Sequence, residues 1–528
     1  MNLKKPDDGR AEYSTAYKVG QDNIQPFGLD ILNPVFGTSA IIVLAFIIGT
    51  ILFPADSKEI LVGARGWSIA NFDWLFMIAG NIFVLFCLAL IVLPFGKIRL
   101  GGANAKPDHS TMSWFAMLFA AGMGIGLMFW SVAEPVAYYT GWYGTPLNVE
   151  AHTPAGEQAA LGATMFHWGL HPWAIYGVVA LSLAFFAYNK GLPLTIRSAF
   201  YPLLGERVWG TIGHVIDVLA VIATIFGLAT SLGLGSQQAT SGLNFLFGIP
   251  NTLTTQIIVI LVVTAVAIVS VARGLEGGVK LLSNINMIMA ASLAVFVLVL
   301  GNTGAILGSV GAILFGYIDG IIPLSNWIGR DDETFYHGWT VFYWAWWISW
   351  APFVGMFIAR VSRGRTVREF LTAVLLVPTV VTVFWMAIFG GSAIDQVKNS
   401  IGVLGDKGIT DVSLAMFQMF EHLPLTNLIS FVGIILVLVF FVTSSDSGSL
   451  VIDGITAGGK TDAPMVQRVF WAILEGIIAI ALLVGGGAEA LSAIQAAAIT
   501  IGLPFTLLML VMCIGLYKGL KSDLHLYK

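Results

Sequence analysis

The chain has few charged residues and few cysteines, and each shortage excludes a class of protein. Charged side chains make up 11% of its 528 residues and hydrophobic ones 57%, which leaves too little polar surface for a soluble globule. The formal net charge of −4 provides no basic excess for a nucleic-acid partner. Cys87 and Cys513 both lie in apolar runs, so we expect packed thiols rather than a disulfide.

The motifs of several enzyme classes are also absent. The sequence has no CxxC pair, no HExxH zinc motif and no GxxxxGK[ST] phosphate-binding loop. His167 and His171 lack the acidic or cysteine neighbours in the sequence that a metal or haem site would need. We therefore expect neither an enzyme nor a bound cofactor.

Apolar runs of membrane-spanning length are abundant instead. A hydrocarbon core of about 30 Å needs about 20 apolar residues, and twelve runs qualify: 33–53, 72–95, 112–138, 159–188, 212–236, 253–273, 280–301, 337–361, 368–391, 426–452, 467–487 and 490–516. The sequence thus predicts an all-α membrane protein with twelve transmembrane helices in contact with lipid. The first 30 residues lack the apolar stretch of a signal peptide, so we expect them to remain on the chain.

Basic residues predict the orientation of these spans. With twelve spans, 21 of the 26 lysines and arginines fall in the N-terminal tail, the C-terminal end and the loops on that side. Short loops rich in lysine and arginine stay in the cytoplasm. Both termini are therefore expected there.

Two spans contain residues that interrupt helices. Gly122, Gly124 and Gly126 alternate in the third span, which favours either unwinding or a small-residue packing face. The eighth span, five helices later, contains Pro352, which removes a backbone donor. Because transporters place substrate sites at interrupted helices, two breaks five spans apart predict repeats at spans 3–7 and 8–12. Five is odd, so the repeats must be inverted.

Aromatic residues concentrate near these positions. Residues 339–353 hold five of the chain's sixteen tryptophans, a density that suits either an interfacial aromatic belt or a site for methylated cations. The fourth span carries Trp168, Trp173 and Tyr176 around Pro172. Their spacing spreads the rings over a broad sector, which favours a box around a ligand.

Polar groups in the spans allow two interpretations. Residues 440–448 of the tenth span are rich in hydroxyls, which bind a small hard cation or bond back to their own helix. Glu134 and Asp446 are expected to be structural partners in the core, because a charge buried in a membrane is usually paired or functional.

Three stretches, Met123–Gly126, Phe166–Tyr176 and above all Phe342–Arg365, resemble the betaine/choline/carnitine transporters, and the resemblance extends over about residues 30–520. It implies a leucine-transporter-like fold of two inverted five-helix repeats, usually trimeric, in the inner membrane of a bacterium. The implied segments are a cytoplasmic tail (1–30), two additional helices (31–111), a first repeat (112–301), a periplasmic amphipathic connection (302–336), a second repeat (337–516) and a short cytoplasmic tail (517–528).

The resemblance also implies site residues. The expected substrate-binding residues are Trp168, Trp173, Tyr176, Trp347, Trp350, Gly122, Gly124, Gly126 and Phe129. A coupling sodium ion is expected at Ala120, Met123, Phe440, Thr443 and Ser444. A second sodium site would use Thr224 and Phe353 together with position 228, where this chain has Leu228. Leucine offers no oxygen, which puts the second ion in doubt.

The implied activity is sodium-coupled uptake of an osmolyte by alternating access. Choline-type relatives carry an acidic residue at the position of Gly126, and its absence here favours a zwitterion, glycine betaine first. Dimethylsulfoniopropionate, ectoine, carnitine and proline remain alternatives, as does proton-coupled choline uptake. A passive osmolyte channel and a sensor that does not transport are the alternatives of another class.

Overall fold

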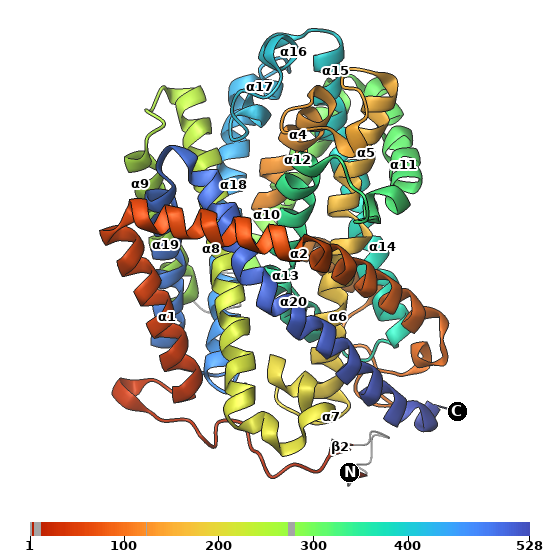
Figure 1. Ribbon diagram of the computed structural model, residues 1–528, viewed down its shortest axis with the longest axis vertical. Coiled ribbons are helices and arrows are strands. Elements are labelled where there is room, and N and C mark those ends of the chain that lie inside the picture. Colours follow the sequence, from red (N-terminus) through yellow and green to blue (C-terminus); the bar gives the residue numbers. More distant parts are fainter. Residues whose placement is uncertain (1–2, 5–11, 123, 273–279, 528) are drawn as a thin grey trace.

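The computed structural model describes residues 3–4, 12–122, 124–272 and 280–527, and it is dominated by helices (Figure 1). The two strands, β1 (Leu3–Lys4) and β2 (Glu12–Tyr13), form one antiparallel pair. The helices of the first part are α1 (Asn33–Leu52), α2 (Pro54–Val92), α3 (Thr111–Gly122), α4 (Ile125–Thr140), α5 (Pro154–Trp168), α6 (Leu170–Tyr188), α7 (Tyr201–Leu204), α8 (Thr211–Phe247), α9 (Leu253–Ala272) and α10 (Lys280–Leu300).

The second part begins with α11 (Thr303–Ser325), which precedes the short α12 (Glu333–Phe335). The remaining helices are α13 (Val341–Val361), α14 (Val367–Met386), α15 (Ser392–Lys398), α16 (Gly402–Lys407), α17 (Ala415–Phe420), α18 (Thr426–Thr456), α19 (Met465–Gly486) and α20 (Ala490–Asp523). Two π-helical turns, Tyr336–Thr340 and Ala387–Gly391, lead into α13 and α15.

Among the described residues, twelve helices are long and apolar enough to cross a membrane, which confirms the predicted class. This set includes α11 and omits the pair α3 and α4, because the break leaves each piece with fewer than 18 residues. Figure 1 shows α11 confined to the end of the molecule that carries α15 to α17, whereas the first described residues and the end of α20 lie together at the opposite end. Termini on one side require an even number of crossings. The arrangement fits twelve crossings in which α3 and α4 form one span and α11 lies at the membrane edge.

The third span is broken where its glycines predict. The helix α3 ends at Gly122, and α4 begins at Ile125 after Gly124, whose backbone is extended (φ −169°). Residue 123 lies outside the described residues. Because of this interruption, the first backbone N–H groups of α4 have no partner within a helix. These N–H groups lie inside the protein.

The eighth span differs from the prediction, and the fourth span is broken at a glycine. The helix α13 continues through Pro352, because neighbouring helices support a proline inside a membrane helix. In the fourth span the break falls at Gly169, and Pro172 lies in the first turn of α6, where proline is tolerated. A Cβ at position 169 would lie 2.8 Å from the Tyr317 hydroxyl, which accepts a hydrogen bond from the Leu170 N–H at 2.9 Å. Gly169 therefore gives this hydroxyl access to the broken turn.

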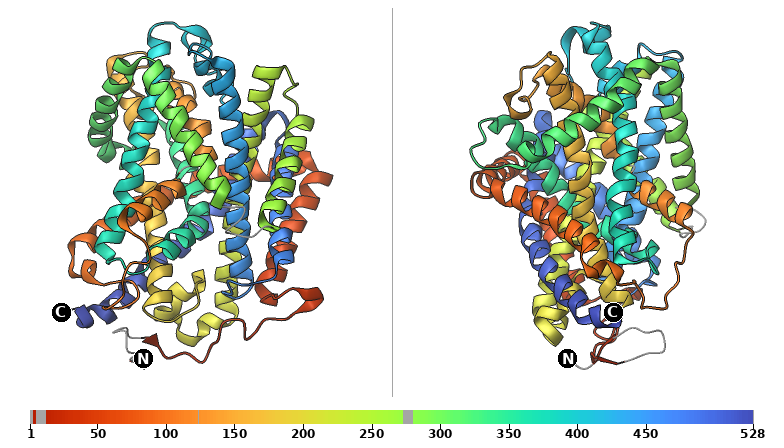
Figure 2. Two further views of the ribbon diagram at one scale, coloured as in Figure 1. Left: turned by 180° about the vertical axis from the view of Figure 1, so that it is seen from behind. Right: turned by 90° about the vertical axis from the view of Figure 1, so that its right-hand side faces the viewer.

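The helices after α2 pack reciprocally, as two inverted repeats would. The third helices of the two halves, α8 and α18, pack against each other, and so do the fourth helices, α9 and α19. The fifth helix of each half, α10 or α20, packs against the third helix of the other half, α18 or α8. Figure 2 shows α9 and α19 at the side of the molecule that carries α1, with α18 between them and the rest of the bundle.

Candidate functional site

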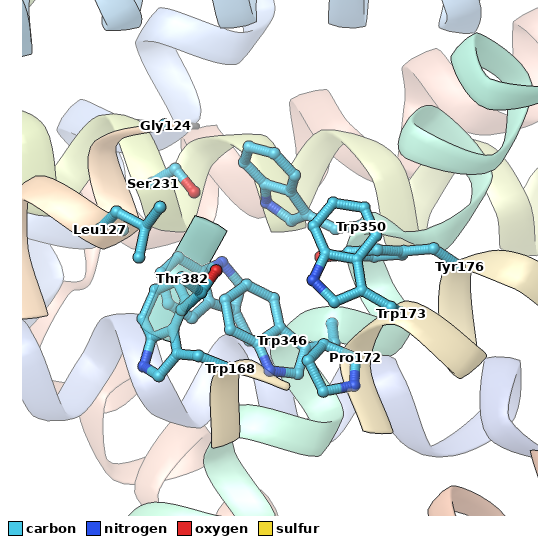
Figure 3. Close-up of a pocket in the computed structure, with 12 residues that line it drawn as sticks. Gly124, Leu127, Trp168, Pro172, Trp173, Tyr176, Ser231, Trp346, Trp350 and Thr382 are labelled. Carbon is cyan, nitrogen blue, oxygen red and sulfur yellow. The ribbon is translucent and has the colours of Figure 1, made fainter. Parts of the chain in front are cut away.

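A cluster of aromatic rings lines a cavity beside the broken third span. Its empty volume, which includes space open to solvent, is about 510 Å³. The side chains and glycines that line it come from α4, α5, α6, α8, α13 and α14, with Gly124 at the break (Figure 3). They are Gly124, Gly126, Leu127, Trp168, Pro172, Trp173, Tyr176, Ser231, Trp346, Trp347, Trp350 and Thr382.

Trp347 is at the centre of the ring cluster. Its ring stands edge-on to Trp168, with centroids 4.9 Å apart, and to Tyr176 at 6.3 Å. Trp346 stacks on it at 4.7 Å, and Trp173 packs edge-on against Tyr176 at 5.5 Å. Rings at steep angles present π-faces in several directions, which is the arrangement that binds a quaternary ammonium group.

Hydrogen bonds fix the orientation of three of these indoles. Trp347 Nε1 donates to the His167 carbonyl at 2.9 Å, and Trp350 Nε1 donates to the Gly227 carbonyl at 2.7 Å. Trp168 Nε1 donates to the Glu134 carboxylate at 2.6 Å. Because these three indole nitrogens bond to groups outside the cavity wall, the rings present π-faces and carbon edges to the cavity, although Trp346 covers part of Trp347.

Gly126 permits the close approach of α4 to the rings. A Cβ at this position would lie 2.9 Å from Cη2 of both Trp168 and Trp346, so any side chain would displace them. Gly124 differs, because nothing lies within 4 Å of a Cβ placed there. Only one of the two glycines is therefore required by the packing of the rings.

The polar side chains on the cavity wall are hydroxyls. Ser231 and Thr382 turn their oxygens towards the space between the rings (Figure 3). Thr382 is buried, and in the described part of the chain its hydroxyl has no hydrogen-bond partner, whereas Thr379 one turn earlier bonds to the Leu375 carbonyl at 2.6 Å. The Thr382 hydroxyl is thus available to a ligand.

The structure brings together most of the residues expected to bind substrate. Trp168, Trp173, Tyr176, Trp347, Trp350, Gly124 and Gly126 all line the cavity. Phe129 is buried, packs edge-on against Trp130 and lies outside the described cavity wall, whereas Gly122 is the last residue of α3.

Sequence reasoning missed Leu127, Pro172, Ser231, Trp346 and Thr382 as members of the wall. Trp346 could have been found from its position beside Trp347, and Leu127 from its position after Gly126. Ser231 and Thr382 are isolated hydroxyls in apolar helices and carry no signal in the sequence.

The residues expected to bind the first sodium ion are only partly described. Met123 lies outside the described residues, and Ala120 precedes the break in α3. Thr443 Oγ1 donates to its own helix, 3.1 Å from the Val439 carbonyl and 3.2 Å from the Phe440 carbonyl. Ser444, like Thr443, is half-buried on α18, which packs against α4. The lone pairs of the two hydroxyl oxygens remain usable by a cation.

The position of the second sodium site contains an apolar contact. Leu228 is buried, and its Cδ1 lies 2.1 Å from the place of a Cβ on Gly448, so it fills the narrow contact between α8 and α18. Thr224 donates its hydroxyl to the Ala220 carbonyl at 2.7 Å, and Phe353 packs edge-on against Trp350.

Comparison with known proteins identifies the family. The betaine/carnitine/choline family transporter profile matches residues 34–525. The chain is 65% identical to glycine betaine transporter 1 of Vibrio parahaemolyticus, over 97% of this chain and 98% of that protein. It is 58% identical to a glycine betaine/proline/choline/ectoine transporter of the same species, over 98% and 92% of the two chains. A glycine betaine transporter of Acinetobacter baylyi is 42% identical, over 93% and 74%. The chain therefore belongs to the betaine/carnitine/choline family of transporters.

Proposed function

We propose that this transporter takes up glycine betaine by sodium-coupled alternating access. The observation that supports the substrate is the two-part lining of the cavity. The rings around Trp347 suit a trimethylammonium head, and the hydroxyls of Ser231 and Thr382, with the backbone at Gly124, suit a carboxylate. A zwitterion with one group at each end satisfies both parts.

The names of the relatives support an osmolyte as the substrate, and they add further osmolytes to the candidates. The 65% identical relative is named for glycine betaine alone, whereas the 58% identical one is named for glycine betaine, proline, choline and ectoine. Choline, proline, ectoine, carnitine and dimethylsulfoniopropionate are therefore the competing substrates to test. The box favours those with a methylated onium head.

The proposed coupling ion is one sodium ion bound by Ala120, Met123, Phe440, Thr443 and Ser444. The hydroxyl oxygens of Thr443 and Ser444 support this sodium site. The packing of α18 against α4, the helix that follows the break, supports it too. A membrane potential of 100 mV contributes about 2.3 kcal/mol per charge, so one sodium ion gives roughly fiftyfold accumulation from voltage alone. The packing of Leu228 against Gly448 argues against a second ion at Thr224 and Phe353.

The proposed setting is a homotrimer in the inner membrane of a bacterium, with both termini in the cytoplasm. Lysine and arginine counts support the orientation, and the common end of both termini in Figure 1 agrees with it. Cysteine labelling from the two sides of right-side-out vesicles tests the orientation, and the mass of the detergent-solubilised protein tests the trimer.

The decisive experiment is uptake by the purified protein in liposomes. Labelled glycine betaine, choline, proline, ectoine, carnitine and dimethylsulfoniopropionate are compared with and without a sodium gradient. We expect concentrative uptake of glycine betaine that requires external sodium. Equilibration without any gradient would indicate a channel, binding without flux would indicate a sensor, and uptake driven by a proton gradient alone would refute sodium coupling.

A further inference from the structure

Glu134 is a buried carboxylate directly behind the aromatic box. It lies on α4, is fully buried, and within the described residues no lysine or arginine pairs with it. Its Oε1 accepts from Tyr138 Oη at 2.8 Å and lies 2.9 Å from His167 Nδ1, which is also 3.0 Å from Tyr138 Oη. Its Oε2 accepts from Trp168 Nε1 at 2.6 Å and from Tyr343 Oη at 2.5 Å. His167 thus has an acidic neighbour after all, supplied by the fold.

One arrangement of the protons satisfies the network with a net negative charge. His167 Nε2 lies 2.9 Å from the Thr340 hydroxyl, so a neutral imidazole protonated on Nδ1 donates to Glu134 and accepts from Thr340. The two tyrosine hydroxyls and the indole supply the other donors. These four donors converge on the two oxygens of one carboxylate, and an ionised carboxylate accepts with both of its oxygens.

This charge reaches the cavity through two rings. Trp168 lines the cavity with its nitrogen at the outer edge (Figure 3), and that nitrogen carries the bond to Glu134. Tyr343, also bonded to Glu134, stacks on Trp347 with centroids 5.7 Å apart. Glu134 therefore holds Trp168 directly and supports the central ring, Trp347, from behind.

We propose that Glu134 is the positioning and specificity residue for the onium head, acting through the orientation of Trp168 and through its own negative charge. This inference rests on the proposed function. In an apolar site, a fixed negative charge separated from a cation by about the width of one indole attracts that cation strongly. A hydrogen bond from the indole N–H to an anion also makes the ring faces more negative, which strengthens the attraction. Glu134 also repels a carboxylate, so it orients a zwitterion with its ammonium group towards Trp168. It supplies part of the countercharge that Gly126 lacks.

The test compares glycine betaine with its carbon isostere, 3,3-dimethylbutanoate, which has the same shape and carboxylate but no positive charge. Equilibrium binding of both ligands is measured by calorimetry on the purified full chain in detergent with saturating sodium chloride. In Glu134→Gln we expect glycine betaine to bind about tenfold more weakly, while binding of 3,3-dimethylbutanoate is unchanged or tighter. A purely structural role would weaken both ligands together.

Glu157→Gln is the matched control, because it removes one negative charge from α5, at the end of that helix remote from Trp168. Glu157 pairs with Lys398 at 2.7 Å and lies outside the cavity wall. We expect both ligands to bind this variant as they bind the wild type.

Two further outcomes keep the inference separate from the proposed function. A wild type that binds neither glycine betaine nor choline would overturn the proposed function itself. A wild type that binds glycine betaine, with a Glu134→Gln variant of unchanged ligand preference, would overturn only the role of Glu134. If Glu134→Gln does not fold, the double variant Glu134→Gln/Tyr343→Phe removes one donor that the amide would face, and the same comparison of ligands applies.

Discussion

Removal of the Trp347 ring should weaken glycine betaine uptake about thirtyfold. Trp347 contacts three other rings of the cavity wall: Trp168 at 4.9 Å, Tyr176 at 6.3 Å and Trp346 at 4.7 Å between centroids. One desolvated ring contributes about 2 kcal/mol to the binding of a cation. Because about 1.4 kcal/mol corresponds to a factor of ten in affinity, the loss corresponds to roughly thirtyfold.

Trp347→Ala also removes packing, so a control must separate affinity from stability. Replacing a buried tryptophan with alanine costs about 3–5 kcal/mol of folding free energy. Trp339 is equally suitable for truncation, because it is buried against Trp130 and Tyr138 and donates to the Tyr143 carbonyl at 3.3 Å. It lies outside the cavity wall. We expect Trp339→Ala to lower thermal stability comparably and to leave the KM for glycine betaine near the wild-type value.

The assay is sodium-driven uptake in liposomes, normalised to the amount of inserted protein, with thermal stability measured on the same preparations. The expected result is a large increase in KM for Trp347→Ala alone. The box assignment fails if Trp347→Ala and Trp173→Ala both take up glycine betaine with the wild-type KM. It also fails if Trp339→Ala raises KM as strongly as Trp347→Ala.

Four other perturbations test separate parts of the proposal. Thr443→Ala should sharply weaken the sodium dependence of uptake, and an unchanged sodium activation curve would remove Thr443 from the ion site. The wild type should show a Hill coefficient for sodium nearer one than two, and Leu228→Thr should raise this coefficient. A coupling ratio of two sodium ions in the wild type, measured by reversal potential, would contradict the expectation of a single ion. Gly126→Asp adds a negative charge that suits choline, so choline uptake should appear in this variant. The Cβ of the new side chain would lie 2.9 Å from Trp168, so glycine betaine uptake should become weaker at the same time. Gly126→Ala should weaken glycine betaine uptake without adding choline uptake. Burial raises the pKa of Asp30, but hydrogen bonds from Lys460 and from Asn23 outweigh this effect and hold the pKa below its ordinary value. These bonds to the Asp30 carboxylate therefore stabilise the N-terminal segment at neutral pH, and their contribution is lost as the pH falls through the lowered pKa. Hydrogen exchange of residues 12–32 should accelerate, relative to the intrinsic rates, as the pH is lowered through this value and in Asp30→Asn at pH 7. Equal protection of the wild type at low pH, of the wild type at pH 7 and of Asp30→Asn at pH 7 would refute the link.

Much of the membrane architecture could be predicted from the sequence, because the signals are local. Long apolar runs and the distribution of lysine and arginine act on each span separately. The break after Gly122 follows from three closely spaced glycines in one helix. The rings that line the cavity belong to two segments of the chain, and within each segment they are close together in the sequence.

The remaining features depend on contacts between helices and were therefore mispredicted or missed. Proline was expected to interrupt α13 at Pro352, yet the helix continues, while Gly169 breaks the fourth span where Tyr317 from α11 meets it. Thr382 reaches the cavity from α14, whose sequence contains no motif. A local pattern cannot reveal which neighbour supports a proline or accepts a freed N–H group.

Glu134 shows most clearly how the site depends on assembly. Its four donors come from α4, α5 and α13, and only packing brings these helices to one carboxylate. The box is likewise shared: Trp347 is tied to the His167 carbonyl of α5, whereas Trp350, one turn later on α13, is tied to the Gly227 carbonyl of α8. A movement of α13 with α5 relative to α8 would keep the first bond and break the second. Trp168 of α5 and Trp347 of α13 would then move together, and Trp350 would be the ring whose contact changes.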